Sequence, residues 1–394
     1  MNSNKPKIAL ENLIKIYGKN PRKALKIFRD GATKDYILEA TGNVVGVADV
    51  SLEIGQGELF VVMGLSGSGK STLVRCINSL IPATSGNIYI DGEDIVHVSD
   101  ERMRELRRTQ VTMVFQRFGL FPHKTVAENV AYGLKVRGVE KNQRRQKALE
   151  TLEVVSLAQW ADYHPSALSG GMQQRVGLAR ALATDAPILL MDEAFSALDP
   201  LIRREMQDEL IRLQKELHKT IVFISHDIQE ALKLADRLAV MKDGYVVQLG
   251  TPEEIINNPA DDYIRAFIQD VNRASVIKVG AIARNPNSFM LESKLVKAAM
   301  IEMSAEDREQ KYVLDGDGKP VGLVTAARLA KALEVGENDI AKAMARNFPK
   351  VDKTTKLEEI FPLCQGGEAI AVVDGKGKLA GVVEQSDVFA NMVN

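Results

Sequence analysis

The sequence predicts an α/β domain around a mainly parallel sheet over residues 1–270, followed by a smaller α+β module. Three observations support this fold class. Short buried strands alternate with helical stretches in the first two-thirds of the chain, a glycine-rich loop joins one strand to a helix, and a repeated hairpin pattern begins after about residue 270. Strands that alternate with helices indicate a parallel sheet covered by those helices.

The predicted strands of the first domain are continuous apolar runs, which is typical of strands buried on both faces. They are Glu58–Met63, Thr112–Phe115, Ile188–Met191 and Thr220–Ser225. A helical stretch, Ser71–Leu80, follows the first strand. Because ligands of such sheets bind at the carboxyl ends of the strands, we expect the functional residues at that edge.

The composition excludes several classes of protein. A chain of 394 residues with 45% hydrophobic and 26% charged residues is typical of two or three globular domains. The net charge of −1 argues against a nucleic-acid polymer as the main partner. Two cysteines, Cys76 and Cys364, exclude a disulfide framework and fit a reducing cytosol. We see no signal peptide and no apolar run long enough to span a membrane, so we expect a soluble intracellular protein.

An insertion is predicted within the first domain at residues 19–43. Its first part, Lys19–Arg29, carries five positive charges and no negative one, and its apolar residues fall on one face of a short helix. A solvated surface helix is the simpler interpretation. A contact with anionic lipid or with the acidic surface of a partner is the alternative.

An internal repeat marks the second part of the chain. Val313–Thr325 aligns with Val372–Glu384 at an offset of 59 residues. Each copy has an apolar strand, an Asp-Gly pair, a second strand and then a helix. We expect the Asp-Gly pairs to supply the positive φ of a tight hairpin. A two-copy repeat of this kind predicts two small modules that pack against each other.

The segment Gly64–Ser71 fits the pattern G-x-x-x-x-G-K-[ST] between a buried strand and a helix. Glycines let successive backbone N–H groups turn inward around phosphates, and the following helix presents its positive end. Lys70 is expected to reach the β- and γ-phosphates, and the Ser71 hydroxyl to bind Mg²⁺. The predicted phosphate-binding residues are Gly64, Leu65, Ser66, Gly67, Ser68, Gly69, Lys70, Ser71 and Thr72.

Further polar residues follow the other predicted strands. Asp192 and Glu193 end an apolar run, so Asp192 is expected to hold Mg²⁺ with Ser71, and Glu193 to polarise the attacking water. His226 and Gln116 also follow buried strands. We expect His226 to act at the catalytic edge, although solvated histidines are common. Gln116 is placed to reach the metal or the water.

Two other segments are candidates for nucleotide contacts. Ser169 precedes Gly170 and Gly171 at the start of a predicted helix, Gln173–Ala183. Exposed N–H groups at a helix start suit a second anion-binding surface, and Gln173 belongs to the same segment. Both this segment and the phosphate loop are predicted to bind a phosphate. The simplest explanation is that one nucleotide is held between two subunits. Tyr17 ends the first strand pattern and is a candidate to stack on adenine, with ordinary packing as the competing interpretation.

Taken together, these motifs resemble the ATPase subunit of ATP-binding-cassette (ABC) transporters. The resemblance covers residues 6–270 and includes the signature segment Leu168–Gln173 and the loop Ser196–Asp199, which that family uses between subunits. It implies a P-loop NTPase fold with a RecA-like core and a helical subdomain at about 117–180. It also implies ATP and Mg²⁺ as cofactors, and a head-to-tail dimer of two copies with ATP between them. Asp199 then joins the nucleotide-binding residues.

A finer resemblance extends over the whole chain. The segment Asp192–Glu209, the insertion and the stretch Phe118–His123 are similar to ATPases of glycine betaine and proline betaine importers for quaternary-amine osmoprotectants. The repeats at 271–336 and 337–394 resemble tandem cystathionine-β-synthase (CBS) domains. The resemblance implies membrane permease partners, an indirect link to a substrate-binding protein, and a peripheral position on the cytoplasmic face of the cell membrane. The regions 118–134 and 140–157 are then expected to face the permease.

Neither repeat keeps the whole nucleotide motif of CBS domains. The first has Arg328 where that motif has aspartate, and the second has Glu384 in place of the hydroxyl while keeping Asp387. A response to ionic strength and a cyclic dinucleotide bound between the repeats are both open hypotheses, and so is a role in dimerisation alone. The alternative for the whole protein is a soluble cassette ATPase that acts on nucleic acid or another assembly without a permease.

Overall fold

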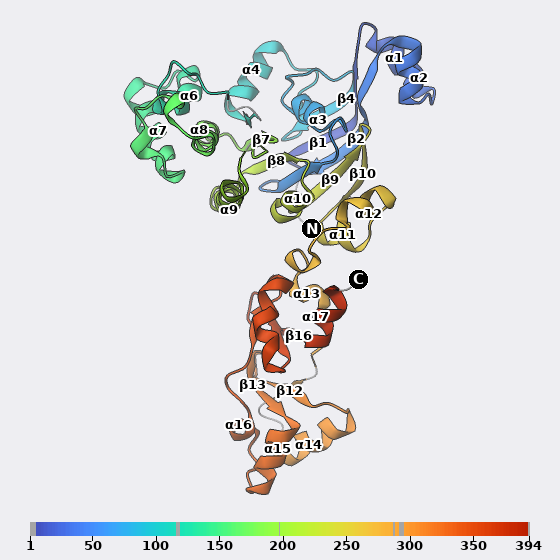
Figure 1. Ribbon diagram of the computed structural model, residues 1–394, viewed down its shortest axis with the longest axis vertical. Coiled ribbons are helices and arrows are strands. Elements are labelled where there is room, and N and C mark those ends of the chain that lie inside the picture. Colours follow the sequence, from blue (N-terminus) through green and yellow to red (C-terminus); the bar gives the residue numbers. More distant parts are fainter. Residues whose placement is uncertain (1–4, 116–118, 197, 287, 291–294, 393–394) are drawn as a thin grey trace. The chain divides into compact units, whose positions relative to one another are not determined.

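The computed structural model describes residues 5–115, 119–196, 198–286, 288–290 and 295–392. The chain divides into two compact units, Met1–Gln269 and Asp270–Asn394 (Figure 1). Within the described ranges, no helix is both long enough and apolar enough to cross a membrane.

A six-stranded sheet forms the centre of the N-terminal unit. Its strands are β3 (Leu59–Met63), β6 (Val111–Val114), β7 (Ile188–Asp192), β8 (Thr220–Ser225), β9 (Arg237–Lys242) and β10 (Tyr245–Gly250). Their order is β10–β9–β3–β8–β7–β6; neighbouring strands are parallel from β9 to β6, and β10 is antiparallel to β9. Every residue of β3, β7 and β8 is buried, as the continuous apolar runs predicted. The predicted α/β fold of this unit is confirmed.

A second, antiparallel sheet lies over one face of the helix that follows the phosphate loop. Its strands are β1 (Ile8–Tyr17), β2 (Val44–Ile54), β4 (Ser85–Ile90) and β5 (Glu93–Asp94), in the order β2–β1–β4–β5. The helix is α3 (Lys70–Ile77). Leu13 of β1, Phe60 of β3 and Leu73 of α3 are all buried in one hydrophobic core. This shared core fixes α3 between the two sheets, and with it the loop that precedes α3.

A group of helices inserted between β6 and β7 has a hydrophobic core of its own. It comprises α5 (Val126–Val130), α6 (Tyr132–Val136), α7 (Lys141–Val154) and α8 (Gly170–Ala183), which lie together at one end of the unit (Figure 1). The other α-helices among the described residues of the unit are α1 (Pro21–Arg29), α2 (Lys34–Thr41), α4 (Asp100–Thr109), α9 (Pro200–Leu217), α10 (Ile228–Leu234), α11 (Pro252–Asn257) and α12 (Asp262–Ile268), and short 3-10 helices lie at η1 (Ala158–Trp160) and η2 (Pro165–Ala167).

The C-terminal unit contains two three-stranded sheets of the same design. One consists of β11 (Ser288–Met290), β12 (Gln310–Leu314) and β13 (Pro320–Thr325), and the other of β14 (Lys350–Asp352), β15 (Ile370–Val373) and β16 (Leu379–Val383). In each, the first pair of strands is parallel and the second antiparallel. In the described part of this unit the α-helices are α13 (Val279–Ile282), α14 (Val296–Ala305), α15 (Ala326–Glu334), α16 (Ile340–Ala343) and α17 (Gln385–Met392), and there are 3-10 helices at η3 (Arg273–Ser275) and η5 (Leu357–Gly366).

Each sheet of this unit has its own hydrophobic core, and each core includes a segment that the sequence assigns to the other repeat. Val279 of α13 is buried with Leu357 and Val372 in the core of the second sheet. Ile340 of α16 is buried with Val313 in the core of the first. No single boundary in the sequence therefore separates the residues of one core from those of the other.

One of the two repeat hairpins differs from the sequence prediction in the position of its positive φ. Gly318 (+81°) belongs to the Asp317–Gly318 pair, so the prediction is confirmed in the first repeat. In the second repeat positive φ occurs at Gly377 (+78°), two residues after Gly375 of the Asp-Gly pair. The reason is that the aspartate side chain itself organises the turn. Asp374 Oδ1 accepts hydrogen bonds from two backbone N–H groups of the second loop, both at 2.9 Å, and Asp315 Oδ1 does the same in the first, at 3.0 and 2.8 Å. The loop therefore closes as a longer, bulged turn instead of a two-residue one.

Candidate functional site

The phosphate loop runs from β3 into α3 with a backbone shape that requires glycine. Gly64 and Gly69 have φ of +148° and +100°. A methyl group at Gly64 would lie 2.2 Å from the carbonyl oxygen of Met241, and one at Gly69 would lie 2.3 Å from that of Gly46. The loop is thus pressed against neighbouring backbone. The first N–H groups of α3 receive no side-chain cap, which suits an anionic ligand.

Two buried polar side chains of this loop fit a phosphate ligand. Lys70 is 5% exposed, and its Nζ donates hydrogen bonds to the carbonyl oxygens of Gly64 and Leu65, both at 2.8 Å. Burial lowers the pKa of Lys70, while Glu193 acts in the opposite direction. The hydroxyl of Ser68 is buried without a hydrogen-bond partner. A cation and an unsatisfied donor at one loop match the chemistry of phosphate oxygens.

A hydroxyl and a carboxylate meet beside the loop, as expected for the metal site. Ser71 Oγ donates to Asp192 Oδ1 at 2.7 Å, and Asp192 is only 3% exposed at the end of β7. Arg75, one turn along α3 from Ser71, donates to the other carboxylate oxygen at 3.0 Å. Mg²⁺ commonly takes one or two protein oxygens and completes its shell with phosphates and water, so this pair fits it. The third predicted ligand, Gln116, lies outside the described residues.

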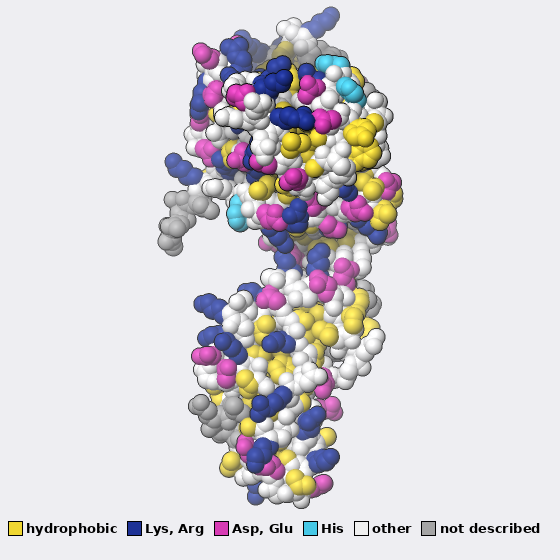
Figure 2. Space-filling view, turned by 90° about the vertical axis from the view of Figure 1, so that its left-hand side faces the viewer, with side chains coloured by type: hydrophobic (Ala, Val, Ile, Leu, Met, Phe, Trp, Pro, Cys, Tyr) yellow, Lys and Arg dark blue, Asp and Glu magenta, His cyan; other side chains and the backbone are white. Residues whose placement is uncertain are grey.

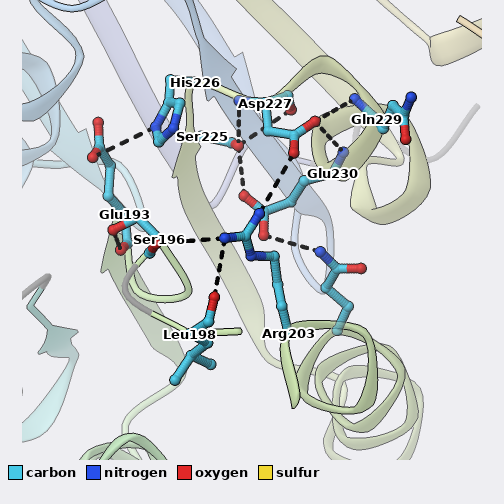
Figure 3. Close-up of polar contacts among 10 residues, drawn as sticks. Glu193, Ser196, Leu198, Arg203, Ser225, His226, Asp227, Gln229 and Glu230 are labelled. Atoms are coloured by element: carbon cyan, nitrogen blue, oxygen red, sulfur yellow. Dashed lines mark hydrogen bonds and ion pairs between the residues drawn. The ribbon is translucent and has the colours of Figure 1, made fainter. Parts of the chain in front are cut away.

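Glu193 and His226 face each other across the ends of β7 and β8. The Glu193 carboxylate lies 3.6 Å from His226 Nδ1 (Figure 3). Glu193 has φ of +46°, an uncommon backbone conformation for a residue other than glycine. It turns the chain sharply after Asp192 and brings the carboxylate to the cavity described next. Strained backbone of this kind is frequent at functional sites.

A cavity of about 400 Å³ opens beside the phosphate loop. Its wall includes Ser66, Gly67, Gly69, Lys70, Ser71, Thr72, Tyr17 and Glu193. The Tyr17 hydroxyl lies 3.1 Å from that of Thr72, so the ring is held at the rim. A methyl group at Gly46 would come within 2.8 Å of the ring, so Gly46 leaves room for it. The structure therefore brings Tyr17, the loop and Glu193 to one cavity.

The signature segment lies elsewhere in the unit. Ser169 caps α8 by accepting a hydrogen bond from the backbone N–H of Met172 at 3.3 Å. The Gln173 amide donates to two backbone carbonyls of its own segment, at 3.0 and 3.2 Å. A methyl group at Gly171 would lie 2.7 Å from the Ile202 side chain of α9, which gives this glycine a packing role as well. Ser169, Gly170, Gly171, Gln173 and Asp199 are not part of the cavity wall formed by the same chain.

A buried carboxylate organises the loop that carries His226. Glu230 is 8% exposed and accepts hydrogen bonds from Ser225 Oγ at 2.5 Å and from the Gln207 amide at 3.0 Å. Burial raises the pKa of Glu230, and these two hydrogen bonds lower it. Ser225 Oγ also accepts from the backbone N–H of Asp227, at 3.0 Å. The residues on both sides of His226 are thus fixed by side chains below them (Figure 3).

Arg203 of α9 links this loop to the segment after Glu193. Its guanidinium donates to the carbonyl oxygen of Leu198 at 3.1 Å and lies 3.5 Å from that of Ser196. On its other side it lies 3.8 Å from the Asp227 carboxylate. Ser196 Oγ in turn donates to the carbonyl oxygen of Glu193 at 2.9 Å. Figure 3 shows how Arg203 lies between the segment of Ser196 and Leu198 and the Asp227 side chain.

Comparison with known proteins places this geometry in a family. The family model "ABC transporter" matches residues 47–196, and the model "CBS domain" matches residues 338–394. The chain is 48% identical to a glycine betaine transport ATP-binding protein of Bacillus subtilis, over 96% of this chain and 90% of that protein. It is 47% identical to a glycine betaine/proline betaine transport ATP-binding protein of Escherichia coli, over 96% of each chain.

The chain belongs to the ABC transporter ATP-binding proteins. Among solved structures, the N-terminal unit resembles the dimeric ABC transporter cassette MJ0796, with 34% identity and a TM-score of 0.53 over 62% of this chain and 98% of that one. A second structure of MJ0796, described as a post-hydrolysis state bound to ADP and Pi, matches equally well. The family and fold predicted from the motifs are confirmed, and so is the binding of ATP.

Sequence reasoning missed three contributors to the site of this ABC protein. Arg75 stands four residues after Ser71 on a predicted helix, and that spacing was a usable signal. Arg203 meets Asp227 only because α9 packs beside the end of β8. The third contributor is helix α2, whose Lys34 reaches the cavity from the insertion. Neither of the last two has a local signal in the sequence.

Proposed function

We propose that this chain is the ATP-hydrolysing subunit of an ABC importer for glycine betaine or related quaternary-amine osmoprotectants. The observation that carries the proposal is similarity over 96% of the chain to two transport proteins whose names specify glycine betaine. Other relatives are named for glycine betaine/carnitine and for trimethylamine N-oxide transport. These solutes share a small, methylated, nitrogen-centred polar group.

The side chains of the cavity fit ATP hydrolysis. Lys70 and the N–H groups at the start of α3 hold the phosphates, and Ser71 and Asp192 present oxygen atoms for a metal. Mg²⁺ bound there would neutralise charge on the β- and γ-phosphates. Glu193 polarises the attacking water, and His226 orients the carboxylate and contacts the γ-phosphate.

The active form in this proposal is a head-to-tail dimer. Ser169, Gln173 and Asp199 stand apart from the cavity of their own chain, so a second copy is needed to bring them to a nucleotide. The capped start of α8 then presents its N–H groups to the γ-phosphate held by the phosphate loop of the other copy. The solved structure of the similar cassette MJ0796 is a dimer, which supports this arrangement.

The permease partner is proposed to dock on the helical subdomain. A hollow of about 410 Å³ opens there between α5, α6 and α7. It is lined by side chains of both charges together with apolar atoms, among them Lys124, Glu128, Tyr132, Lys141, Arg145 and Asp162. The side of the N-terminal unit that carries α6 and α7 faces the viewer in Figure 2, where apolar and charged side chains are mixed. Docking there places the chain at the cytoplasmic face of the membrane, with a substrate-binding protein reached only through the permease.

The C-terminal unit is proposed to regulate transport. Asp387, the acidic residue of the second repeat's motif, forms an ion pair with Arg284 and accepts a hydrogen bond from the backbone N–H of Glu384 at 2.9 Å. The cavity beside Arg284 has about 40 Å³, whereas ligand sites commonly have at least ~300 Å³. A ribose at Asp387 would have to displace Arg284, and a cyclic dinucleotide would have to widen this cavity. A response to ionic strength needs neither change, because salt weakens the ion pair directly. Calorimetric titration of the full chain with cyclic di-AMP and AMP separates them, since the absence of heat would favour ionic strength.

Two variants and one uptake assay test the proposed function. Glu193→Gln should keep ATP affinity but stop turnover and accumulate dimers, because it removes only the group that polarises water. Lys70→Ala should abolish ATP binding. Hydrolysis at the normal rate by Glu193→Gln would refute the assigned base. Cells that lack the gene should lose betaine accumulation in high salt, and normal uptake in them would refute the transport role.

A further inference from the structure

The insertion after β1 folds as two helices that are fixed to the antiparallel sheet. Ala24 of α1 and Ile37 of α2 are both fully buried, in a small core that includes Ile16 of β1 and Val45 of β2. Thr33 caps α2 by accepting a hydrogen bond from the backbone N–H of Tyr36, at 3.3 Å. The helix α2 therefore has a defined face against the sheet and a defined face away from it.

One face of α2 forms part of the wall of the nucleotide cavity. Lys34, Asp35 and Leu38 all line it together with the phosphate loop. Residues three and four apart lie on the same side of a helix, so these three side chains share one face, next to the face of Ile37. Nothing in the charge pattern of the insertion pointed to this contact, because the basic residues that stand out lie on α1.

Lys34 ties α2 to the same backbone that supports the phosphate loop. Its ammonium group donates a hydrogen bond to the carbonyl oxygen of Asp243, in the turn between β9 and β10. The next residue, Gly244, donates its N–H to the carbonyl oxygen of Ser68 at 2.9 Å. Burial lowers the pKa of Lys34, and Asp243 acts in the opposite direction. The position of α2 is thus set relative to the loop through one short turn.

Three apolar side chains expose much of their surface on this cavity. Tyr17 is 37% exposed, and Leu38 and Val44 are each 49% exposed. They come from the end of β1, from α2 and from the start of β2. Polar residues of the phosphate loop and of α3, among them Lys70, Ser71 and Thr72, form another part of the wall. A ligand that matches this wall has a flat apolar part and an anionic part, which is the chemistry of a nucleoside triphosphate.

We infer that α2 of the insertion is one wall of the base subsite, where Leu38 packs on the adenine that Tyr17 stacks against. Lys34 is a positioning residue that holds α2 at the cavity. This inference rests on the proposed ATP site and adds a contact that the phosphate motif does not supply. It also gives residues 34–41 a role distinct from the basic surface of α1.

The experiment measures binding of two probes, ATP and inorganic tripolyphosphate, by calorimetry in the presence of Mg²⁺. Leu38→Ala removes apolar contact from a half-exposed position, so its affinity for ATP should fall about 5-fold. Its affinity for tripolyphosphate, which has no base, should stay within 2-fold of wild type. Tyr36→Ala on the outer side of the same helix is the matched control and should change neither. Lys34→Ala should reproduce the effect of Leu38→Ala.

An unchanged ATP affinity in Leu38→Ala, or equal losses for both probes, would overturn the inference. Leu38→Met keeps an apolar side chain of similar volume and should restore most of the ATP affinity. Failure of the wild-type chain to bind either probe, or normal ATP binding by Lys70→Ala, would instead refute the proposed ATP site itself. Different measurements would therefore refute the base subsite and the ATP site.

Discussion

Replacement of Arg203 by alanine tests whether the loop after Glu193 must be held to the loop that carries His226. The hydrogen bond from the guanidinium to the Leu198 carbonyl, at 3.1 Å, is a charged contact of ~1.5–3 kcal/mol. The ion pair to Asp227 spans 3.8 Å between side chains that are 30% and 39% exposed, so it contributes only ~0–1 kcal/mol. The variant therefore loses about 2–3 kcal/mol of the interactions that join the loop after Glu193 to the loop of His226.

We expect this loss to appear in turnover and not in nucleotide affinity. Arg203 is not part of the cavity wall, so the KM for ATP should stay within about 2-fold of wild type. If half or more of the lost energy is needed to place Glu193 and His226, kcat should fall about 10-fold, since each 1.36 kcal/mol of barrier is a factor of ten. Steady-state ATPase kinetics of the transporter complex, with thermal unfolding of the same samples, measure both quantities.

The neighbouring Arg204 provides the matched control. It carries the same charge on the same helix but is exposed, so Arg204→Ala should keep kcat. Arg203→Lys retains the charge near Asp227 without the planar fork and should recover only part of the rate. The reasoning is refuted if Arg203→Ala keeps wild-type kcat, or if KM and kcat change together.

Three further predictions follow from other contacts. Gly64→Ala should reduce ATP affinity more than 100-fold, because its methyl group would meet a carbonyl oxygen at 2.2 Å; Gly67→Ala, with open space around it, should lose less in the same binding assay. Glu230→Gln should gain stability relative to wild type as the pH rises. Burial raises the folded-state pKa of Glu230 above its ordinary value of 4.5, so wild-type stability falls between that value and the raised pKa, and urea unfolding from pH 4 to 8 would reveal the difference. Tyr312→Phe should cost ~1–3 kcal/mol in urea unfolding of the full chain, because the buried hydroxyl donates to the Ala369 carbonyl; an unchanged midpoint would contradict this.

Much of the site could be predicted because its motifs are short and local. The phosphate loop is eight consecutive residues whose glycines are needed for its own backbone shape. The placement of Asp192 and Glu193 beside it follows from a general rule, since parallel strands end at one edge of a sheet. The pairing of β7 with β8, and of β8 with β3, then brings these carboxylates to the loop. In the second repeat the positive φ lies two residues beyond the predicted Asp-Gly pair, because hydrogen bonds from the backbone to the Asp374 side chain extend the turn.

The sequence by itself determined the fold class, the phosphate loop, the ends of the catalytic strands and the family. These features depend on residues that are close in the chain or on the hydrophobic pattern of whole elements. Only the tertiary structure decided that α2 lines the nucleotide cavity and that Arg203 spans two loops. Such contacts join residues separated by up to about two hundred positions, as Lys34 and Asp243 are. They exist because the shared core between the two sheets fixes where the insertion and α9 lie, and no local pattern encodes that packing.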